Sequence, residues 1–346
     1  MAEDEQRPLK RLRTLAADSE DGAPPAGSSL AAPAVDLEHD SEFWLEDGNV
    51  VLVAKNVGFR VYKGLLAAQS PVFYDMFSAT SLLADEQHDG VPIVRLCDSP
   101  EDLRHLFRVL LPKTQKDVLK DTYNLKTEFH VISALIRLSR KYQIEDVEKR
   151  SLSALCAIYA TELCRWADID SAIDEEDRFF AIAAVNLARL TDTPSILPSA
   201  LYHCVLLQSD LLLGFTREDG TKEYLSQEDL GKCIDGTAQL VASRNTLTLS
   251  LASCIRESGA DSCLRPGLCA IARKTLSESM VARPLHPGHE AHALSSEARR
   301  WAQHGLCDRC IAKLENKEDV LLMNLWTHLP TVFKVDGLGD AWPKAL

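Results

Sequence analysis

The chain has 346 residues, of which 46% are hydrophobic, and it carries a formal charge of −13 at pH 7 with an isoelectric point near 5.3. This length allows a sizeable core and predicts two domains, while the acidic balance argues against binding nucleic acid through a basic surface. No run approaches the roughly 20 apolar residues of a membrane helix, and no signal peptide opens the chain. Ten scattered cysteines are typical of reduced thiols. We therefore expect a soluble intracellular protein, in the cytoplasm, the nucleus or both, without direct contact to membrane or nucleic acid.

The first 40 residues have the composition of a disordered tail. Asp, Glu, Pro, Gly, Ser and Ala dominate them, and no apolar period is sustained, so burial would not offset the entropy of ordering. Within this tail lies the basic segment Lys10–Arg13. It is either a nuclear-import signal or a short cluster of solvated charges, and such clusters are common enough in tails to favour the second interpretation.

From about Ser41 onward the pattern predicts ordered elements. Their expected order is strand, strand, helix, helix, strand, helix, over Asn49–Ala54, Phe59–Tyr62, Lys63–Ser70, Ser70–Phe77, Val91–Leu96 and the stretch after Ser99. Ser70-Pro71 predicts an N-cap followed by a proline at the first helical position. A strand that feeds two short buried helices indicates a helical hairpin and not a catalytic loop.

Nine residues at fixed spacing carry a resemblance to a known family. They are Phe59, Lys63, Leu66, Ala67, Ala68, Ser70, Phe73, Met76 and Phe77. This pattern resembles the core motif of the BTB/POZ domain, in which a histidine most often stands where this chain has Tyr62. Tyrosine keeps an aromatic ring with a hydrogen-bonding tip, so we expect the fold to tolerate it.

The resemblance implies an α+β fold class. This is the BTB/POZ fold, a small sheet flanked by helix pairs, followed by a mostly α-helical C-terminal region, as in fungal BTB-domain proteins that the chain resembles. The expected organisation is a disordered tail (1–40), a BTB/POZ domain (41–156), a helical C-terminal region (157–335) and a loose tail (336–346).

The resemblance also implies a function in protein–protein interaction. BTB domains typically dimerise through the first strand and the first helix, here taken as Val50–Ala54 and Leu65–Ala68. A helix face of small residues suits a close two-fold contact. The expected interaction residues are Val51, Val53, Leu65 and Leu66.

The partner implied first is a second copy of the chain. Some BTB proteins also recruit cullin-type ubiquitin ligases, which would make this protein a substrate adaptor, although the sequence does not place the recruiting motif. The alternative is a nuclear transcription-regulatory scaffold assembled by BTB dimerisation, against which stand the acidic charge and the lack of tandem zinc fingers.

Beyond Ser151 helical periodicity dominates the chain. The predicted helices are Leu152–Ala167, Asp177–Leu190, Ile196–Phe215, Gln227–Ser258, Gly267–Met280, Ser295–Leu314 and Glu318–Leu329. Two polar stretches, Thr216–Glu223 and Arg283–His292, predict linkers. No repeat with a period of roughly 20 to 50 residues is present, so a kelch or ankyrin array is not expected.

Cysteines of the C-terminal region are the one place where the sequence suggests site chemistry. Cys307 and Cys310 form a C-x2-C pair with His304 three residues earlier, and these three are candidate ligands of a tetrahedral zinc ion. On a helix they would share a broad face, which is also how buried structural thiols lie. A redox pair would need a preceding strand. Further cysteines lie upstream, without a second C-x2-C, at Cys254, Cys263 and Cys269.

Packed thiols are the favoured interpretation of this cysteine pattern, so neither a metal nor another cofactor is expected. A second cluster, at His286, His289 and His292, lies beside prolines and a glycine and favours a solvated loop over a metal site. No nucleophile elbow, phosphate-binding glycine loop, metalloprotease motif or kinase motif occurs. We expect no catalytic residue and no enzymatic activity.

Overall fold

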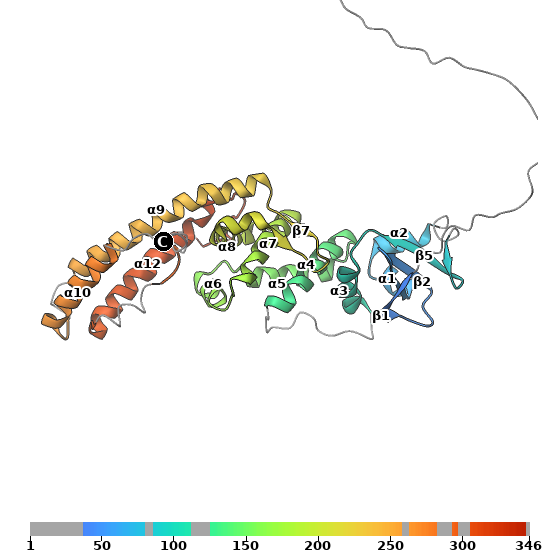
Figure 1. The fold of residues 1–346 in the computed structure, drawn as a ribbon, viewed down its shortest axis with the longest axis horizontal. Helices are drawn as coiled ribbons and strands as arrows, with labels where there is room; N and C mark the ends of the chain where they lie inside the picture. Colours follow the sequence, from blue (N-terminus) through green and yellow to red (C-terminus); the bar gives the residue numbers. More distant parts are fainter. Residues whose placement is uncertain are drawn as a thin grey trace, which may run out of the picture. The chain divides into compact units, whose positions relative to one another are not determined.

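The computed structural model describes residues 37–79, 86–111, 125–257, 263–281, 293–296 and 305–343 (Figure 1). All of them belong to one compact unit that begins at Leu37. Expectations that lie outside the described residues remain predictions. They concern Lys10–Arg13, His286, His289, His292 and His304.

A five-stranded mixed sheet opens the described chain, with strand order β1-β3-β2-β5-β4. β2 lies at its centre, antiparallel to β3 and parallel to β5, while β1 and β4 form the edges. The predicted hairpin and the predicted third strand are confirmed as β2, β3 and β5. The strands are β1 (Glu38–Trp44), β2 (Val50–Ala54), β3 (Val57–Val61), β4 (Gln87–His88) and β5 (Val91–Leu96).

β1 begins at Glu38, so the expected end of the tail at residue 40 is wrong. Its sequence is mostly polar, and buried polar contacts hold it. Asp40 Oδ1 accepts a hydrogen bond from the backbone N–H of Phe43 at 2.9 Å, and Asp40 Oδ2 accepts one from Arg104 Nε at 2.6 Å. Arg104 lies on helix α3 (Pro100–Leu110). Because polar side chains make these contacts, the sequence of β1 has no alternating apolar pattern that would predict a strand.

Helices α1 (Lys63–Ala67) and α2 (Pro71–Ser78) pack with α3 on one face of the sheet (Figure 1). The Ser70 cap is confirmed, because its Oγ accepts from the backbone N–H of Phe73 at 3.1 Å. The same Oγ donates to the carbonyl of Tyr142 at 2.6 Å and so connects the two short helices to a later part of the chain.

Helices α4 (Leu125–Lys141) and α5 (Glu145–Ile158) contribute to two cores at once. Leu135 and Val147 pack in the core of the sheet, whereas Phe129 and Leu155 belong to a second core formed with the later helices. The boundary expected between residues 156 and 157 therefore falls next to a shared core and not at a linker.

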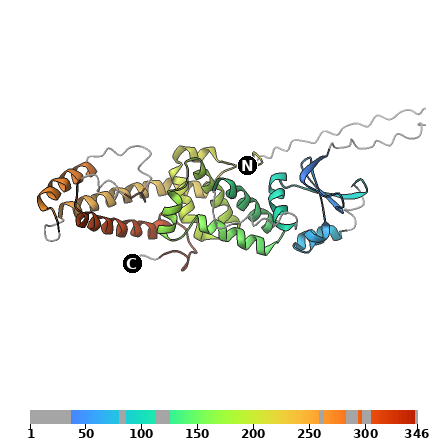
Figure 2. The ribbon, with the colours of Figure 1, turned by 90° about the horizontal axis from the view of Figure 1, so that it is seen from below.

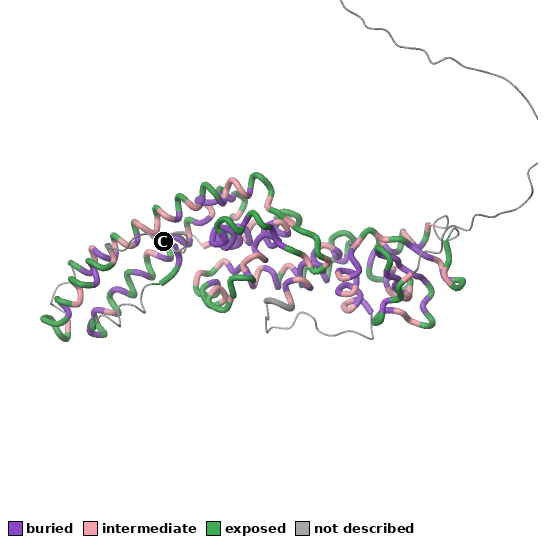
Figure 3. The backbone as a smooth tube through the Cα atoms, viewed as in Figure 1, coloured by how far each residue is buried: buried purple, intermediate pink, exposed green. Residues whose placement is uncertain are grey.

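The residues described after α5 are mostly helical, as predicted. Their elements are α6 (Leu163–Asp170), η2 (Glu176–Phe179), α7 (Phe180–Leu190), η3 (Pro194–Ile196), α8 (Leu197–Leu206), η4 (Gln208–Leu213), β6 (Phe215–Thr216), β7 (Lys222–Glu223), α9 (Gln227–Glu257), α10 (Pro266–Val281) and α12 (Asp308–Val332). Helices α9, α10 and α12 lie side by side, as Figure 2 also shows. Every residue of α8 is buried (Figure 3), which puts this helix at the centre of the second core.

The helix predicted over Leu152–Ala167 is interrupted. α5 ends at Ile158 and α6 starts only at Leu163. In the break, the carbonyl of Thr161 accepts a hydrogen bond from the Trp326 indole at 2.7 Å. A partner 165 residues away in the chain therefore satisfies a backbone group that a continuous helix would have used.

The apolar run from residue 196 to 215 is also not one helix. After α8, Gln208 and Gly214 adopt positive φ angles of 52° and 72°, and the chain turns into the β6–β7 hairpin. Gly214 has little room for a side chain, because a Cβ there would lie 2.6 Å from the carbonyl oxygen of Glu223. The stretch Thr216–Glu223, predicted as a linker, is this hairpin.

Trp342 near the C-terminal end is buried, so the loose tail expected from residue 336 is wrong for this residue. Trp342 is 5% exposed, and its indole ring lies 4.9 Å from that of Trp326 between centroids. Its Nε1 donates to the Trp326 carbonyl at 3.2 Å. A single buried tryptophan in a Gly-rich, polar stretch carries no periodic signal. Among the described helices, none combines the length and apolar content needed to span a membrane.

Candidate functional site

The four expected interaction residues do not share one surface. Val51 and Val53 lie on central strand β2 and are 0% and 1% exposed. They pack with Val91 and Ile93 in a small apolar cluster on the sheet. The expectation that they contact a partner is wrong, because β2 is hydrogen-bonded to strands on both of its sides and the chain has an additional edge strand, β1, before it.

Helix α1 divides its residues between the core and the outside. Leu66 is fully buried beneath the helix, so it is not available to a partner, whereas Leu65 is half-buried. Gly64 and Ala68 are exposed beside Leu65, and a Cβ at Gly64 would meet nothing within 4 Å. Tyr74 of α2 is 60% exposed. Two small residues, Gly64 and Ala68, are therefore exposed beside Leu65 on the first helix.

Residues 44–159 match the BTB/POZ domain family. This part of the chain is a BTB/POZ domain. Tyr62, which departs from the usual motif, donates its hydroxyl to the Asp47 carboxylate. The comparison with curated proteins gave no match for the chain. A BTB domain is a protein–protein interaction module.

The β6–β7 hairpin contacts the BTB domain through a network of charges. Glu223 on β7 pairs with Arg137 of α4, and Arg217 near β6 pairs with Asp102 of α3. Burial raises the pKa of Asp102, although the Arg217 guanidinium opposes this shift. Burial also lowers the pKa of Arg137. The hairpin is thus held on α3 and α4 by ion pairs that are largely removed from water.

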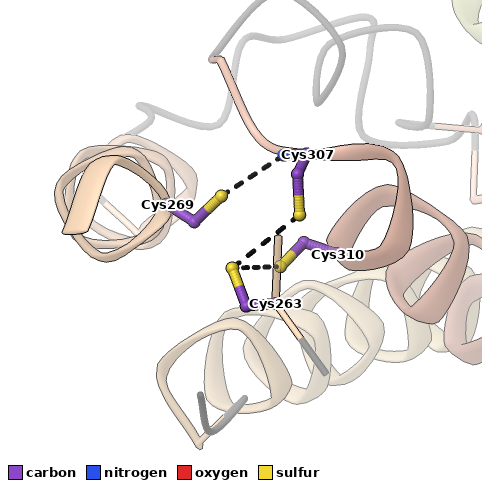
Figure 4. A group of neighbouring side chains, drawn as sticks. All are labelled: Cys263, Cys269, Cys307 and Cys310. Carbon is purple, nitrogen blue, oxygen red and sulfur yellow. Dashed lines mark hydrogen bonds between the residues drawn. The ribbon is translucent and has the colours of Figure 1, made fainter. Parts of the chain in front are cut away.

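A group of cysteines lies at the ends of α10 and α12 (Figure 4). Cys307 and Cys310, predicted as candidate ligands, come together with Cys263 and Cys269, and their four sulfur atoms lie within 4.8 Å of one another. The third predicted ligand, His304, lies outside the described residues. Cys254 packs against the same hydrophobic cluster but is not one of the four.

The backbone around this group differs from the predicted helix over Ser295–Leu314. Gly305 has a φ of 76°, Cys307 is the N-cap of α12, and α12 then runs unbroken to Val332. Cys307 and Cys310 therefore flank a helix start instead of sharing a helix face. Cys269 likewise lies in the first turns of α10, which begins at Pro266.

The sulfur atoms of the group are in contact. Cys263 Sγ lies 3.7 Å from Cys307 Sγ and 3.6 Å from Cys310 Sγ. The backbone N–H of Cys307 donates to Cys269 Sγ at 3.3 Å. Three of the cysteines are buried and Cys263 is half-buried. Figure 4 shows the sulfur atoms of Cys263, Cys307 and Cys310 converging between the helices, with that of Cys269 directed toward the same point.

Backbone donors favour negative charge on Cys307 of this group. The N–H groups of Cys310 and Leu264 donate to Cys307 and lower the pKa of its thiol to about 6. Burial raises the pKa of Cys310 to about 12, and the neighbouring thiols add to this shift. No spacing signal in the sequence indicated Cys263 and Cys269, because they lie 38 to 47 residues before the other two cysteines.

Proposed function

We propose that this protein self-associates through the outer face of α1 in its BTB domain. The observation that carries the proposal is the exposed surface of small residues at Gly64 and Ala68 beside half-buried Leu65. Small side chains let two copies of a helix approach closely around a two-fold axis. The neighbouring Tyr74 adds an exposed aromatic side chain of the type enriched in interfaces.

Light scattering of the full chain tests this proposal. Wild type should elute with twice the chain mass of 38.3 kDa, and Ala68→Arg should reduce the mass to that of one chain. Ala238→Arg is the matched control, since Ala238 is an exposed alanine on the distant helix α9. A monomeric wild type at micromolar concentration, or equal behaviour of both variants, would overturn the proposal.

Within this function we propose the finer role of a substrate adaptor for a cullin-type ubiquitin ligase. An adaptor needs a second surface for its substrate, and the helical C-terminal region offers exposed apolar side chains along α10. Leu264, Leu268 and Ile271 are 57%, 62% and 69% exposed. Leu268 and Ile271 lie three residues apart on α10, so they face the same side, whereas Leu264 precedes the helix.

Binding of purified cullins to the full chain tests the adaptor role, by calorimetry or by co-elution. Binding should persist in Leu268→Glu, because the substrate surface is separate from the BTB domain. The alternative role is a nuclear transcription-regulatory scaffold. In that case no cullin should bind, and a tagged chain should leave the nucleus when residues 10–13 are replaced by alanines. Absence of cullin binding would remove the adaptor role, and a tag that remains cytoplasmic in both forms would remove the alternative.

A further inference from the structure

We propose that Cys263, Cys269, Cys307 and Cys310 together bind one zinc ion as a closed structural site. The four residues supply thiolate ligands only, and zinc binds four cysteine thiolates in a tetrahedral arrangement. Because no position is left for water or substrate, the site would be structural and not catalytic. It lies outside the BTB domain and is independent of the self-association proposed above.

Distances between the sulfur atoms match a single metal centre. With Zn–S bonds of about 2.3 Å, a tetrahedron places its sulfurs about 3.8 Å apart. Cys263 Sγ lies 3.7 Å and 3.6 Å from the sulfurs of Cys307 and Cys310, and no pair in the group exceeds 4.8 Å. A disulfide would need about 2.05 Å, which none of these contacts approaches.

The surroundings of the four sulfurs supply hydrogen-bond donors and a positive charge. Backbone N–H groups are directed at Cys307 and at Cys269. The Arg273 guanidinium nitrogen Nη1 lies 3.9 Å from Cys310 Sγ. Four thiolates around a dication leave net negative charge, and such donors stabilise it and orient the ligands. Thiols that only fill an apolar core have no need of these groups.

Another thiol pair in the same chain shows what simple packing looks like. Cys204 and Cys233 are 0% and 2% exposed, and they interact with each other inside the second core. No further cysteine joins them among the described residues. The convergence of four cysteines from two separate segments is therefore specific to the 263/269/307/310 group.

The geometry of a single centre favours one zinc ion over an iron–sulfur cluster. An all-sulfur tetrahedral set suits either zinc or an iron–sulfur cluster. A cluster places several iron atoms between its cysteines, which separates the sulfurs more than a lone ion does. The near-contact of the sulfurs around Cys263 fits one ion.

The ion would connect α10 to α12 at the end of the third hydrophobic core. That core is small and contains Leu251, Ile255, Leu276 and Leu314 from three helices. Because such a site does not exist in the unfolded chain, the free energy of zinc binding contributes to folding of this helical end. We infer that zinc supplies stability that the small core lacks.

Metal analysis of the purified full chain tests the proposal. Wild type should contain one zinc per chain. The double variant Cys307→Ser/Cys310→Ser should contain none, and Cys204→Ser/Cys233→Ser, which is matched in burial, should keep the ion. Replacement of the metal by Co²⁺ in wild type should give the charge-transfer bands of a tetrahedral four-thiolate site.

Three results would overturn this inference. One is wild type without stoichiometric zinc that also fails to take up Co²⁺ with thiolate bands. Another is iron in place of zinc. The third is a thiol titration of the denatured, chelator-treated chain that finds fewer than the ten cysteines of the sequence, which would indicate a disulfide. Should the Cys307/Cys310 variant not fold, the Co²⁺ spectrum of wild type still decides the question.

Discussion

Arg137 Nη2 lies 2.7 Å from both carboxylate oxygens of Glu223, which joins helix α4 of the BTB domain to the β6–β7 hairpin. Their side chains are only 22% and 13% exposed. Glu223 also accepts a hydrogen bond from Asn186 at 3.2 Å. The hairpin is therefore attached to the BTB domain by a charge pair that water screens weakly.

Glu223→Ala should lower the free energy of unfolding by about 3 kcal/mol, because it leaves the Arg137 charge buried without its partner. Arg137→Met should also destabilise the chain, and the double variant should cost less than the sum of the single ones, with a coupling of about 0.5–3 kcal/mol. Urea unfolding measures all three. Glu145→Gln, at an exposed pair with Lys149, is the control and should change stability by less than about 1 kcal/mol. If the stability losses of the two single variants simply added up in the double variant, the contact between Arg137 and Glu223 would be contradicted.

Local signals of the sequence predicted the elements whose cause is local. The Ser70 cap, the buried face of α2 and the long helix α9 follow from residues within a few positions of one another. Attachments between distant residues were not predictable in this way. Glu223 reads as one more charge in a polar linker until Arg137, 86 residues away, is placed beside it.

The same contrast between local and distant signals applies to the cysteine group. The C-x2-C spacing of Cys307 and Cys310 was visible because both lie in one turn of chain. Cys263 and Cys269 are brought to them because α10 and α12 both pack against α9, which no spacing rule contains. For the BTB domain, strand β2 was taken as the first strand because the polar sequence of β1 hides its strand character.

Two glycines of helix α9 should respond to alanine in opposite directions. At Gly236 a Cβ would lie 2.6 Å from the Phe333 ring, which is fully buried. Gly236→Ala should therefore destabilise the chain, by about 1–3 kcal/mol as for overpacked cores. At Gly231 nothing lies within 4 Å of a Cβ, so Gly231→Ala should stabilise it by up to about 1 kcal/mol through helix propensity. Thermal unfolding of both variants checks this, and a stabilising Gly236→Ala would refute the close contact.

Acid should destabilise the helical region through His203. This side chain is 1% exposed, and burial lowers its pKa from the ordinary 6.5 although Asp170 lies 3.2 Å away and opposes the shift. The unfolded chain then binds the proton more readily than the folded one, so stability is fully present above about pH 6.5 and is lost as the pH falls below that value. Burial also lowers the pKa of His130, so this histidine contributes to the loss of stability in acid in the same way.

His203→Leu should reduce the pH dependence of unfolding below pH 6.5, by at most about 1.4 kcal/mol per pH unit. Urea titrations of variant and wild type across this range measure the difference. Identical slopes for His203→Leu and wild type would show that this histidine does not titrate on unfolding.

Trp342 should contribute to stability as a core residue even though it lies near the end of the chain. Its ring stacks on Trp326 and its Nε1 donates to the Trp326 carbonyl. Trp342→Ala should cost about 3–5 kcal/mol, as is usual for a buried tryptophan. Trp342→Phe keeps part of the ring contact and loses the hydrogen bond, so it should lower the free energy of unfolding by less than Trp342→Ala, but by at least about 1 kcal/mol.

Circular dichroism during urea unfolding measures these differences without relying on tryptophan fluorescence. Ala341→Ser, at the exposed neighbouring position, is the control and should be within about 0.5 kcal/mol of wild type. If Trp342→Ala were as stable as Ala341→Ser, the segment after residue 336 would be the loose tail that its composition suggests. If only Trp342→Ala lost several kcal/mol of unfolding free energy, a single aromatic side chain would be shown to hold this end of the chain on α12.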